Sequence, residues 1–241
     1  MKYLIFDTET IPNQALPADC APQFDESEVK VGNIKDPAKI AAKMAEERAK
    51  FDQAKSKTMS IDPALCQLCT FASAVYDSES GQVEPCVEYQ LTDKDHHDDY
   101  QAAYLAWQTI NDAYTQRMPI VSFNGISFDL PVIWFRMMVQ DIPANLQTYR
   151  TLTAKYTNKY HYDVMQILAG WDRQKWHKLD FYTHLFGVSG KTMSGADVYP
   201  AYQTGEYDRI KEYCMTDVMA LAQVFRQIAP WTVIETNDGG E

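Results

Sequence analysis

The sequence places an apolar run directly before two acids in the stretch Tyr3-Leu4-Ile5-Phe6-Asp7-Thr8-Glu9-Thr10. The apolar run predicts a buried strand. Asp7 and Glu9 are two residues apart, so both carboxylates are expected on one face, near the end of that strand. The two charges repel each other, and a divalent cation such as Mg²⁺ would compensate because it prefers carboxylate oxygens. A strand that simply ends in a polar turn is the alternative, and this stretch alone does not decide between the two.

Composition limits the class of protein. The 241 residues are 46% hydrophobic, which is enough for one sizeable α/β domain or at most two small ones. No apolar run reaches the length of a membrane span and no secretory signal opens the chain, so a cytoplasmic protein with no membrane association is expected. Five cysteines without framework spacing fit a reducing compartment. The net charge of −11 argues against broad electrostatic binding to long duplex DNA, but it suits acids clustered around metal ions.

Hydrophobic periodicity predicts alternating strands and helices. Ile11-Pro12 ends the first strand, and a long polar loop follows. Two strand-like runs, Leu65–Tyr76 and Val83–Leu91, flank a hairpin turn signal and complete a three-stranded antiparallel start to a sheet. A short buried strand is predicted at 119–123. The predicted helices are amphipathic or apolar and cover residues 37–57, 98–116, 130–139 and 206–227.

Two further segments place an acid at the edge of a buried element. Asp129 falls in the first turn of the third predicted helix, where a carboxylate favours the helix dipole. Tyr213 and Asp217 are four residues apart on the last predicted helix, so they are neighbours beside its apolar stripe. An acid in such a place is costly unless it is paired or binds a metal ion.

The segment 150–191 differs in charge from the rest of the chain. Its seven basic residues exceed its three acidic ones, and aromatic residues are interleaved with them. Cations and aromatics together are typical of a surface that stacks the bases and tracks the phosphates of a single strand. The alternative is that most of these aromatics belong to the core. The basic residues are Arg150, Lys155, Lys159, Arg173, Lys175, Lys178 and Lys191.

Three motifs, taken in order, resemble those of the DEDD exonuclease superfamily. Asp7-Thr8-Glu9-Thr10 resembles the first motif, and Asn124-Gly125-Ile126-Ser127-Phe128-Asp129 resembles the second. Tyr213-Cys214-Met215-Thr216-Asp217 is similar to the third motif in its YxxxD form, which marks the DEDDy branch.

The intervening residues extend the resemblance over roughly residues 1–228. His161-Tyr162-Asp163, Lys178-Leu179-Asp180 with Gly187 and Gly190-Lys191, and Ser194–Val198 are similar to stand-alone 3′-5′ exonucleases related to the proofreading domain of family B DNA polymerases.

The resemblance implies a ribonuclease H-like α/β fold, a mixed β-sheet flanked by helices, with a helical insertion after the first strand. One exonuclease domain would span 1–230, including the 13–60 insertion, followed by a flexible tail at 231–241, with no polymerase domain in the chain. The implied substrate is the 3′ end of single-stranded nucleic acid, DNA favoured, released as nucleoside 5′-monophosphates.

The resemblance also implies roles for individual residues. Two Mg²⁺ or Mn²⁺ ions would be held by Asp7, Glu9, Asp129 and Asp217, with Asp7 bridging them. Tyr213 would orient the attacking water rather than deprotonate it, because a phenol has a pKa of about 10. The implied substrate contacts are Thr8, Thr10, Asn124, Phe128 and Lys178.

Two other functions are compatible with parts of the pattern. A ribonuclease H-like module could bind nucleic acid without cutting it, although all four acids and the tyrosine are present. An aspartyl-phosphate phosphatase would use a DxDxT loop, which Phe6–Thr10 superficially resembles, but Glu9 stands where that loop has Asp.

Overall fold

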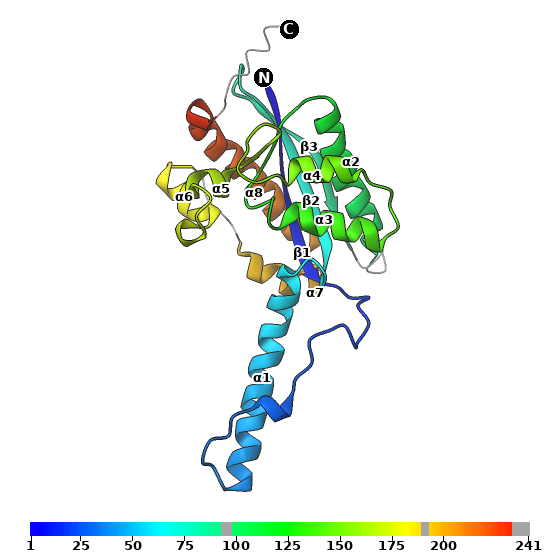
Figure 1. The fold of residues 1–241 in the computed structure, drawn as a ribbon, viewed down its shortest axis with the longest axis vertical. Helices are drawn as coiled ribbons and strands as arrows, with labels where there is room; N and C mark the ends of the chain where they lie inside the picture. The colour runs from blue at the N-terminus through cyan, green and yellow to red at the C-terminus, as the bar shows by residue number, and fades with distance from the viewer. Residues whose placement is uncertain (93–97, 189–192, 233–241) are drawn as a thin grey trace.

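A five-stranded mixed sheet forms the centre of the protein. The computed structural model describes residues 1–92, 98–188 and 193–232. The sheet order is β3-β2-β1-β4-β5, with β1 antiparallel to β2 and parallel to β4, and β2 antiparallel to β3 (Figure 1). The strands are β1 (Lys2–Pro12), β2 (Cys66–Asp77), β3 (Val83–Gln90), β4 (Ile120–Ser122) and β5 (His161–Asp163). The predicted antiparallel start of the sheet is therefore confirmed.

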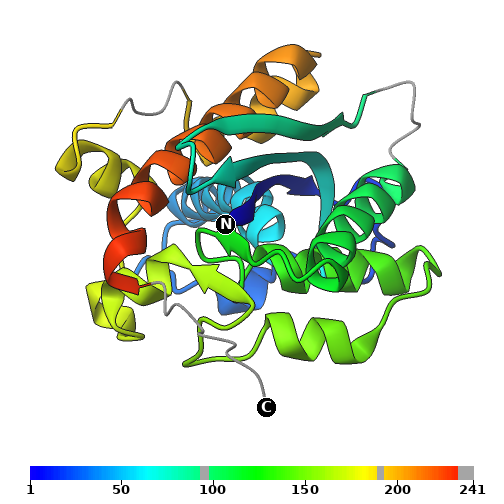
Figure 2. The same cartoon turned by 90° about the horizontal axis from the view of Figure 1, so that it is seen from above.

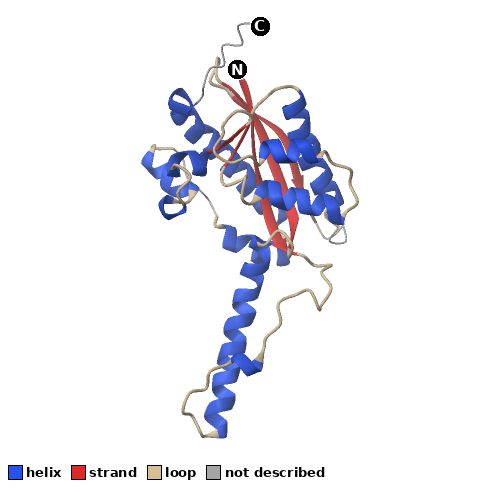
Figure 3. Cartoon of the chain, in the orientation of Figure 1, coloured by secondary structure: helices blue, strands red, loops and turns tan. Residues whose placement is uncertain are grey.

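Helices cover both faces of this sheet. Figure 2 shows α8 on one side and the pair α2 and α3 on the other, and Figure 3 shows the strands between the two helical layers. The helices are α1 (Pro37–Ile61), α2 (Tyr100–Thr115), α3 (Asp129–Val139), α4 (Leu146–Leu152), α5 (Val164–Ala169), α6 (Leu179–Leu185), α7 (Val198–Gln203) and α8 (Tyr207–Thr232). None of the helices among the described residues is long and apolar enough to cross a membrane.

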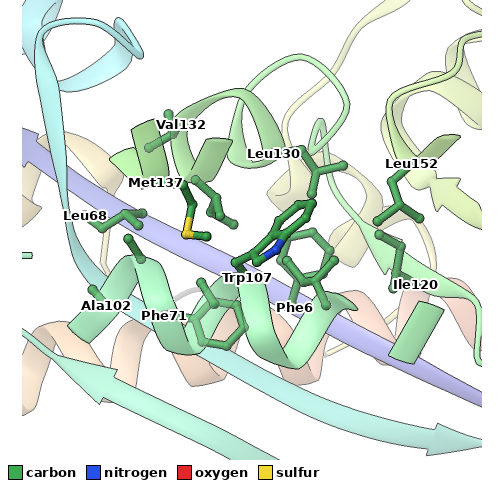
Figure 4. Close-up of a cluster of buried hydrophobic side chains, with 14 of the residues drawn as sticks. Phe6, Leu68, Phe71, Ala102, Trp107, Ile120, Leu130, Val132, Met137 and Leu152 are labelled. Atoms are coloured by element: carbon green, nitrogen blue, oxygen red, sulfur yellow. The ribbon is translucent and has the colours of Figure 1, made fainter. Parts of the chain in front are cut away.

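The alternation of side chains along β1 divides the core in two. Leu4 and Phe6 pack into a cluster with Phe71 and Trp107 under α2 and α3 (Figure 4). Tyr3 and Ile5 pack into a second cluster that includes Phe225 of α8. Even-numbered residues of β1 thus face α2 and α3, and odd-numbered residues face α8. This parity decides where the acids of β1 point.

The acids of β1 lie in the middle of the strand, which corrects the expectation that they stand near its end. β1 continues through Pro12, because β2 pairs with it from Lys2↔Asp77 to Pro12↔Cys66. A register shift between Glu9 and Thr10 marks an irregularity directly after the second acid. Full pairing by β2 satisfies the backbone, so two polar side chains did not end the strand.

A buried ion pair ties α2 to α3. Arg136 donates from Nε and Nη2 to the two carboxylate oxygens of Asp99, both at 2.7 Å. The backbone N–H group of Leu68 donates to the same carboxylate at 2.9 Å. Because both charged groups are buried and paired, this contact fixes the helical layer on one face of the sheet.

The insertion after β1 forms an arm that projects from the body (Figure 1). Asp36 caps α1 by accepting from the N–H group of Ala38, and Pro37 occupies the first turn, as predicted. The helix continues to Ile61, beyond the predicted end at residue 57. Its end is fixed to the sheet, because Met59 is buried and the Thr10 hydroxyl donates to the Ser60 carbonyl oxygen at 2.5 Å.

The CxxC pair is part of the core. Cys66 and Cys69 are buried, and they belong to different hydrophobic clusters. Burial raises the pKa of the Cys66 thiol to about 12. Two protonated thiols in separate clusters are ordinary strand cysteines.

Candidate active site

Asp7 and Glu9 lie on the face of β1 that α8 covers. Their carboxylate oxygens and the Sγ atom of Cys214 lie within 4.8 Å of one another. The Cys214 thiol is 3.5 Å from the backbone oxygen of Asp7 and 3.9 Å from its Oδ2 atom. The first strand and the last helix therefore meet at this pair of acids.

The same helix brings Tyr213 and Asp217 to this group. Both side chains are buried, at 2% and 5% exposure. Burial and the negative charges of Glu9, Asp217 and Asp7 raise the pKa of the Tyr213 phenol far above its usual value, and a hydrogen bond to Asp217 adds to the effect. Three predicted acids and the predicted tyrosine thus gather in one place, and the neighbour relation of Tyr213 and Asp217 is confirmed.

Asp129 approaches from the other side of β1. It lies in the first turn of α3, is 2% exposed, and accepts a hydrogen bond from the Thr8 hydroxyl on its Oδ1 atom at 2.6 Å. Thr8 is an even-numbered residue of β1, so its side chain points away from α8. Burial raises the pKa of Asp129 to about 6, and the hydrogen bond from Thr8 opposes that shift. The three-residue cluster formed by Asp7, Glu9 and Cys214 does not include Asp129.

The loop before Asp129 is held by a carboxylate of β5. The backbone N–H groups of Asn124 and Ile126 donate to Oδ1 and Oδ2 of Asp163 at 2.9 and 3.1 Å. Asp163 also caps α5 through the N–H group of Gln166. Asn124 has a φ of +70°, and its buried side-chain oxygen has no hydrogen-bond partner among the described residues. Asp163 therefore holds Asn124 in a left-handed backbone conformation.

A chain of hydrogen bonds through Ser122 and His161 also holds this loop. The Gly125 N–H group donates to the Ser122 oxygen at 3.1 Å, and that hydroxyl lies 2.7 Å from Nε2 of His161. Nδ1 of His161 lies 2.7 Å from the Leu152 carbonyl oxygen. A Cβ atom on Gly125 would stand 2.2 Å from the Ser122 oxygen, so no other residue fits there without moving the loop.

Other predicted substrate contacts differ in their surroundings. The hydroxyl groups of Thr8 and Thr10 are engaged within the protein, by Asp129 and by the Ser60 carbonyl. Phe128 is half-buried against the core cluster under α2 and α3. Lys178 is exposed at the start of α6.

The aromatic residues of segment 150–191 divide between core and surface. Tyr162 and Tyr182 are buried in the cluster under α8, whereas Tyr156 is 77% exposed and Phe181 46%. Arg173 lies over the ring of Trp176, with its Cζ atom 5.1 Å from the centroid. Lys191 and Gly190 lie outside the described residues. The core alternative therefore holds for Tyr162 and Tyr182, whereas the single-strand surface stays a prediction.

Sequence reasoning did not identify the roles of four further residues at the site, because each also has an ordinary structural role. Cys214 belongs to the apolar stripe of α8, and its contact with Asp7 shows only in three dimensions. Ser122, His161 and Asp163 lie at the ends of short buried strands. Asp163 directly before an apolar run is a helix-capping signal, and that signal could have identified its role.

The donor set fits a hard divalent cation. Burial raises the pKa of both Tyr213 and Cys214, and the charges of Asp7, Glu9 and Asp217 raise it further, so these carboxylates make the local potential negative. Mg²⁺ and Mn²⁺ prefer carboxylate oxygens and would offset that potential, whereas the protonated thiol of Cys214 is a poor ligand for them.

The mixed sheet flanked by helices, with acids on its central strand, defines a ribonuclease H-like α/β protein. Residues 64–231 match the sequence model of a family described as a predicted 3′-5′ exonuclease related to the exonuclease domain of PolB. The chain belongs to this family. The matched range includes Asp129, Tyr213 and Asp217 but begins after β1, so Asp7, Glu9 and α1 lie outside it.

The chain aligns with solved structures. The family B DNA polymerase of the archaeon Pyrobaculum calidifontis aligns with a TM-score of 0.57 at 15% identity, over 95% of this chain and 25% of the polymerase. Escherichia coli exonuclease I in complex with a dT13 oligonucleotide aligns with a TM-score of 0.48 at 12% identity, over 95% of this chain and 41% of that one. The chain therefore spans a quarter of the polymerase and less than half of exonuclease I. No curated protein matches the sequence.

Proposed function

We propose that this protein is a 3′-5′ exonuclease that depends on two divalent metal ions. Its substrate is single-stranded nucleic acid, DNA favoured, and its products are nucleoside 5′-monophosphates. The observation that carries the proposal is the meeting of Asp7 and Glu9 with Tyr213 and Asp217 in a member of an exonuclease family. Residues 1–230 would form one domain, with 13–60 as an insertion.

Four carboxylates would hold the ions, which are Mg²⁺ or Mn²⁺. Asp7 would bridge them, and Glu9, Asp129 and Asp217 would complete the shell. When bound, such a pair of ions stabilises the charge on the attacking and leaving oxygens of a phosphodiester. The Oδ1 atom of Asp129 accepts from the Thr8 hydroxyl, which orients the carboxylate.

Tyr213 would position the attacking water. Its raised pKa keeps the phenol protonated at neutral pH, so it acts as a hydrogen-bonding group and not as a base. The hydrogen bond to Asp217 fixes the direction of its hydroxyl group.

The substrate would be held by residues around these acids. Asn124 has a buried amide oxygen without a partner among the described residues, and it stands on a loop that Asp163 fixes. Phe128 and Lys178 would contact the terminal nucleotides. Thr8 would act mainly through Asp129, and Thr10 would join the site to α1.

Digestion of end-labelled oligonucleotides tests the proposal. With Mg²⁺ or Mn²⁺, a 3′-labelled strand should release labelled mononucleotide at once, whereas a 5′-labelled strand should shorten stepwise. Asp7→Ala should lower the rate by about 10³-fold or more, because several kcal/mol of charge stabilisation depend on the ions. Full activity of that variant, or no mononucleotide from the 3′ end, would refute the exonuclease. Tight single-strand binding without turnover would favour the non-catalytic module instead.

A further inference from the structure

The C-terminal end of α1 joins the arm to the body close to the acids of β1. The helix has 25 residues, which corresponds to about 37 Å. Its last turn is bonded to Thr10, the residue that follows Glu9. From there the helix runs away from the body (Figure 1). A strand whose end lies at the acids could therefore continue along this helix.

One face of α1 carries a row of lysines. Lys43, Lys50 and Lys57 follow one another at intervals of seven residues, and Lys39 lies one turn before Lys43. At 100° per residue, all four fall within about 40° of one another around the helix axis. We call these four residues the lysine row. It extends from Lys39 to Lys57, or over about 27 Å of the helix.

The charges of the lysine row are available to a ligand. Lys39, Lys50 and Lys57 are exposed, and Lys43 is half-buried. Lys39 and Lys57 form no ion pair with any described residue. Lys43 and Lys50 pair only with Glu46 and Glu47 on the same helix, in contacts that water screens. Nucleic-acid phosphates could replace such partners at little cost.

The loop before α1 packs against another face of the helix. Phe24 of the loop before α1 packs on Phe51, with ring centroids 5.6 Å apart. Arg48 lies over the Phe24 ring, 5.2 Å from its centroid. Arg48 and Lys55, also seven residues apart, are about 200° around the axis from Lys50 and Lys57. Arg48 and Lys55 thus lie on the face against which this loop packs, where Arg48 is exposed and pairs with Asp52. The lysine row lies on a different face of the helix.

The charge of α1 contrasts with that of the chain. The helix has six basic and three acidic residues, whereas the whole chain has a net charge of −11. A surface that attracts phosphates is therefore local. We propose that the lysine row binds the phosphates of single-stranded nucleic acid upstream of the 3′ end that occupies the site. This inference deepens the proposed function and rests on it for the identity of the bound strand.

A matched pair of double variants tests the lysine row. Lys50→Gln with Lys57→Gln removes two charges from the row, and Arg48→Gln with Lys55→Gln removes two from the face that the loop before α1 contacts. Binding of a labelled single strand of about 20 nucleotides, longer than a typical single-strand site, is measured in EDTA over a range of salt concentrations. Loss of two phosphate contacts should reduce the slope of log K against log salt by about 1.4 in the first variant only.

The outcomes separate this inference from the exonuclease activity. The strand is supplied as DNA and as RNA, and a smaller slope for the first variant with at least one of them supports the proposal. Equal slopes for both double variants, or no salt-dependent binding by the wild type, overturn it. Release of mononucleotides is measured separately, in the presence of metal. A variant that loses the lysine contact but still cuts, or a wild type that binds through the row but does not cut, therefore distinguishes this inference from the exonuclease activity. A trinucleotide too short to reach the row should be cut equally by both variants.

Discussion

Tyr213 retains its proton because negative groups surround it. Burial and three carboxylates raise its pKa, so the phenol remains a hydrogen-bond donor over the working pH range. The ring also contributes to a hydrophobic cluster, so removal of the hydroxyl group should leave the packing intact.

Tyr213→Phe should lower kcat by about 10²–10³-fold with little change in KM, because a positioned hydrogen-bonding group acts mainly in the transition state. The measurement is steady-state release of nucleotide from a 3′-labelled strand. Tyr76→Phe, a buried tyrosine on β2, serves as the control and should keep the wild-type rate. A rise in KM alone would show that Tyr213 binds substrate instead of positioning water.

Asp129 should make stability depend on pH in the absence of metal. Its folded pKa of about 6 lies above its ordinary value of 3.8, so between these values the folded state binds the proton more tightly than the unfolded chain. The free energy of unfolding should therefore fall as pH rises from about 4 to about 6. Asp129→Asn removes this effect. The free energy of unfolding of the variant, relative to that of the wild type, should therefore rise by up to about 3 kcal/mol between pH 4 and pH 7.

Urea unfolding in EDTA at several pH values measures this difference. Asp172→Asn is a suitable control because a backbone hydrogen bond from Gln174 lowers the pKa of Asp172. That variant should lose stability relative to the wild type as pH rises, which is the opposite trend. A difference for Asp129→Asn that does not change with pH would contradict the assignment.

At the scale of elements, β5 positions the loop between β4 and α3. This strand has only three residues, yet Asp163 accepts from Asn124 and Ile126 and also caps α5. A short strand can thus act as a clamp on a loop that carries site residues.

Asp163→Ala should destabilise the fold by about 1–3 kcal/mol for each buried N–H group that loses its acceptor. It should also raise KM, because Asn124 is no longer held. Denaturant unfolding and nucleotide-release kinetics measure the two effects. Asp172→Ala removes the cap of an exposed turn, so it should cost about 1 kcal/mol and leave KM unchanged. Equal effects of the two variants would show that Asp163 is only a cap.

At the scale of the whole molecule, the arm is separable from the body. The N–H group of Asn13 donates to the Leu65 carbonyl oxygen at 2.9 Å, so the two ends of the insertion lie side by side. Replacing residues 16–57 with a short Gly-Ser linker should change Tm by only a few degrees, because closing a short flexible loop costs little. Calorimetry measures the change, and loss of the cooperative transition would show that the arm is part of the core.

Much of this organisation follows from local patterns in the sequence. The existence of β1, β2 and β3, the start of α1 and the closeness of Tyr213 to Asp217 depend on alternation, capping and helical spacing, which act over a few residues. The position of Asp7 and Glu9 within β1 depended on its pairing with β2, more than 50 residues away. The contact of Thr8 with Asp129 joins residues 121 positions apart, and no local pattern predicts it.

The contact between β1 and α8 also has a consequence for the timing of synthesis. Cys214 and Asp7 are 207 positions apart, so the acids of β1 meet their partners only after α8 has been synthesised. A polypeptide still emerging from the ribosome has no complete set of catalytic groups. A nuclease built in this way would acquire its full set of acids only after α8 has been translated and has packed on β1.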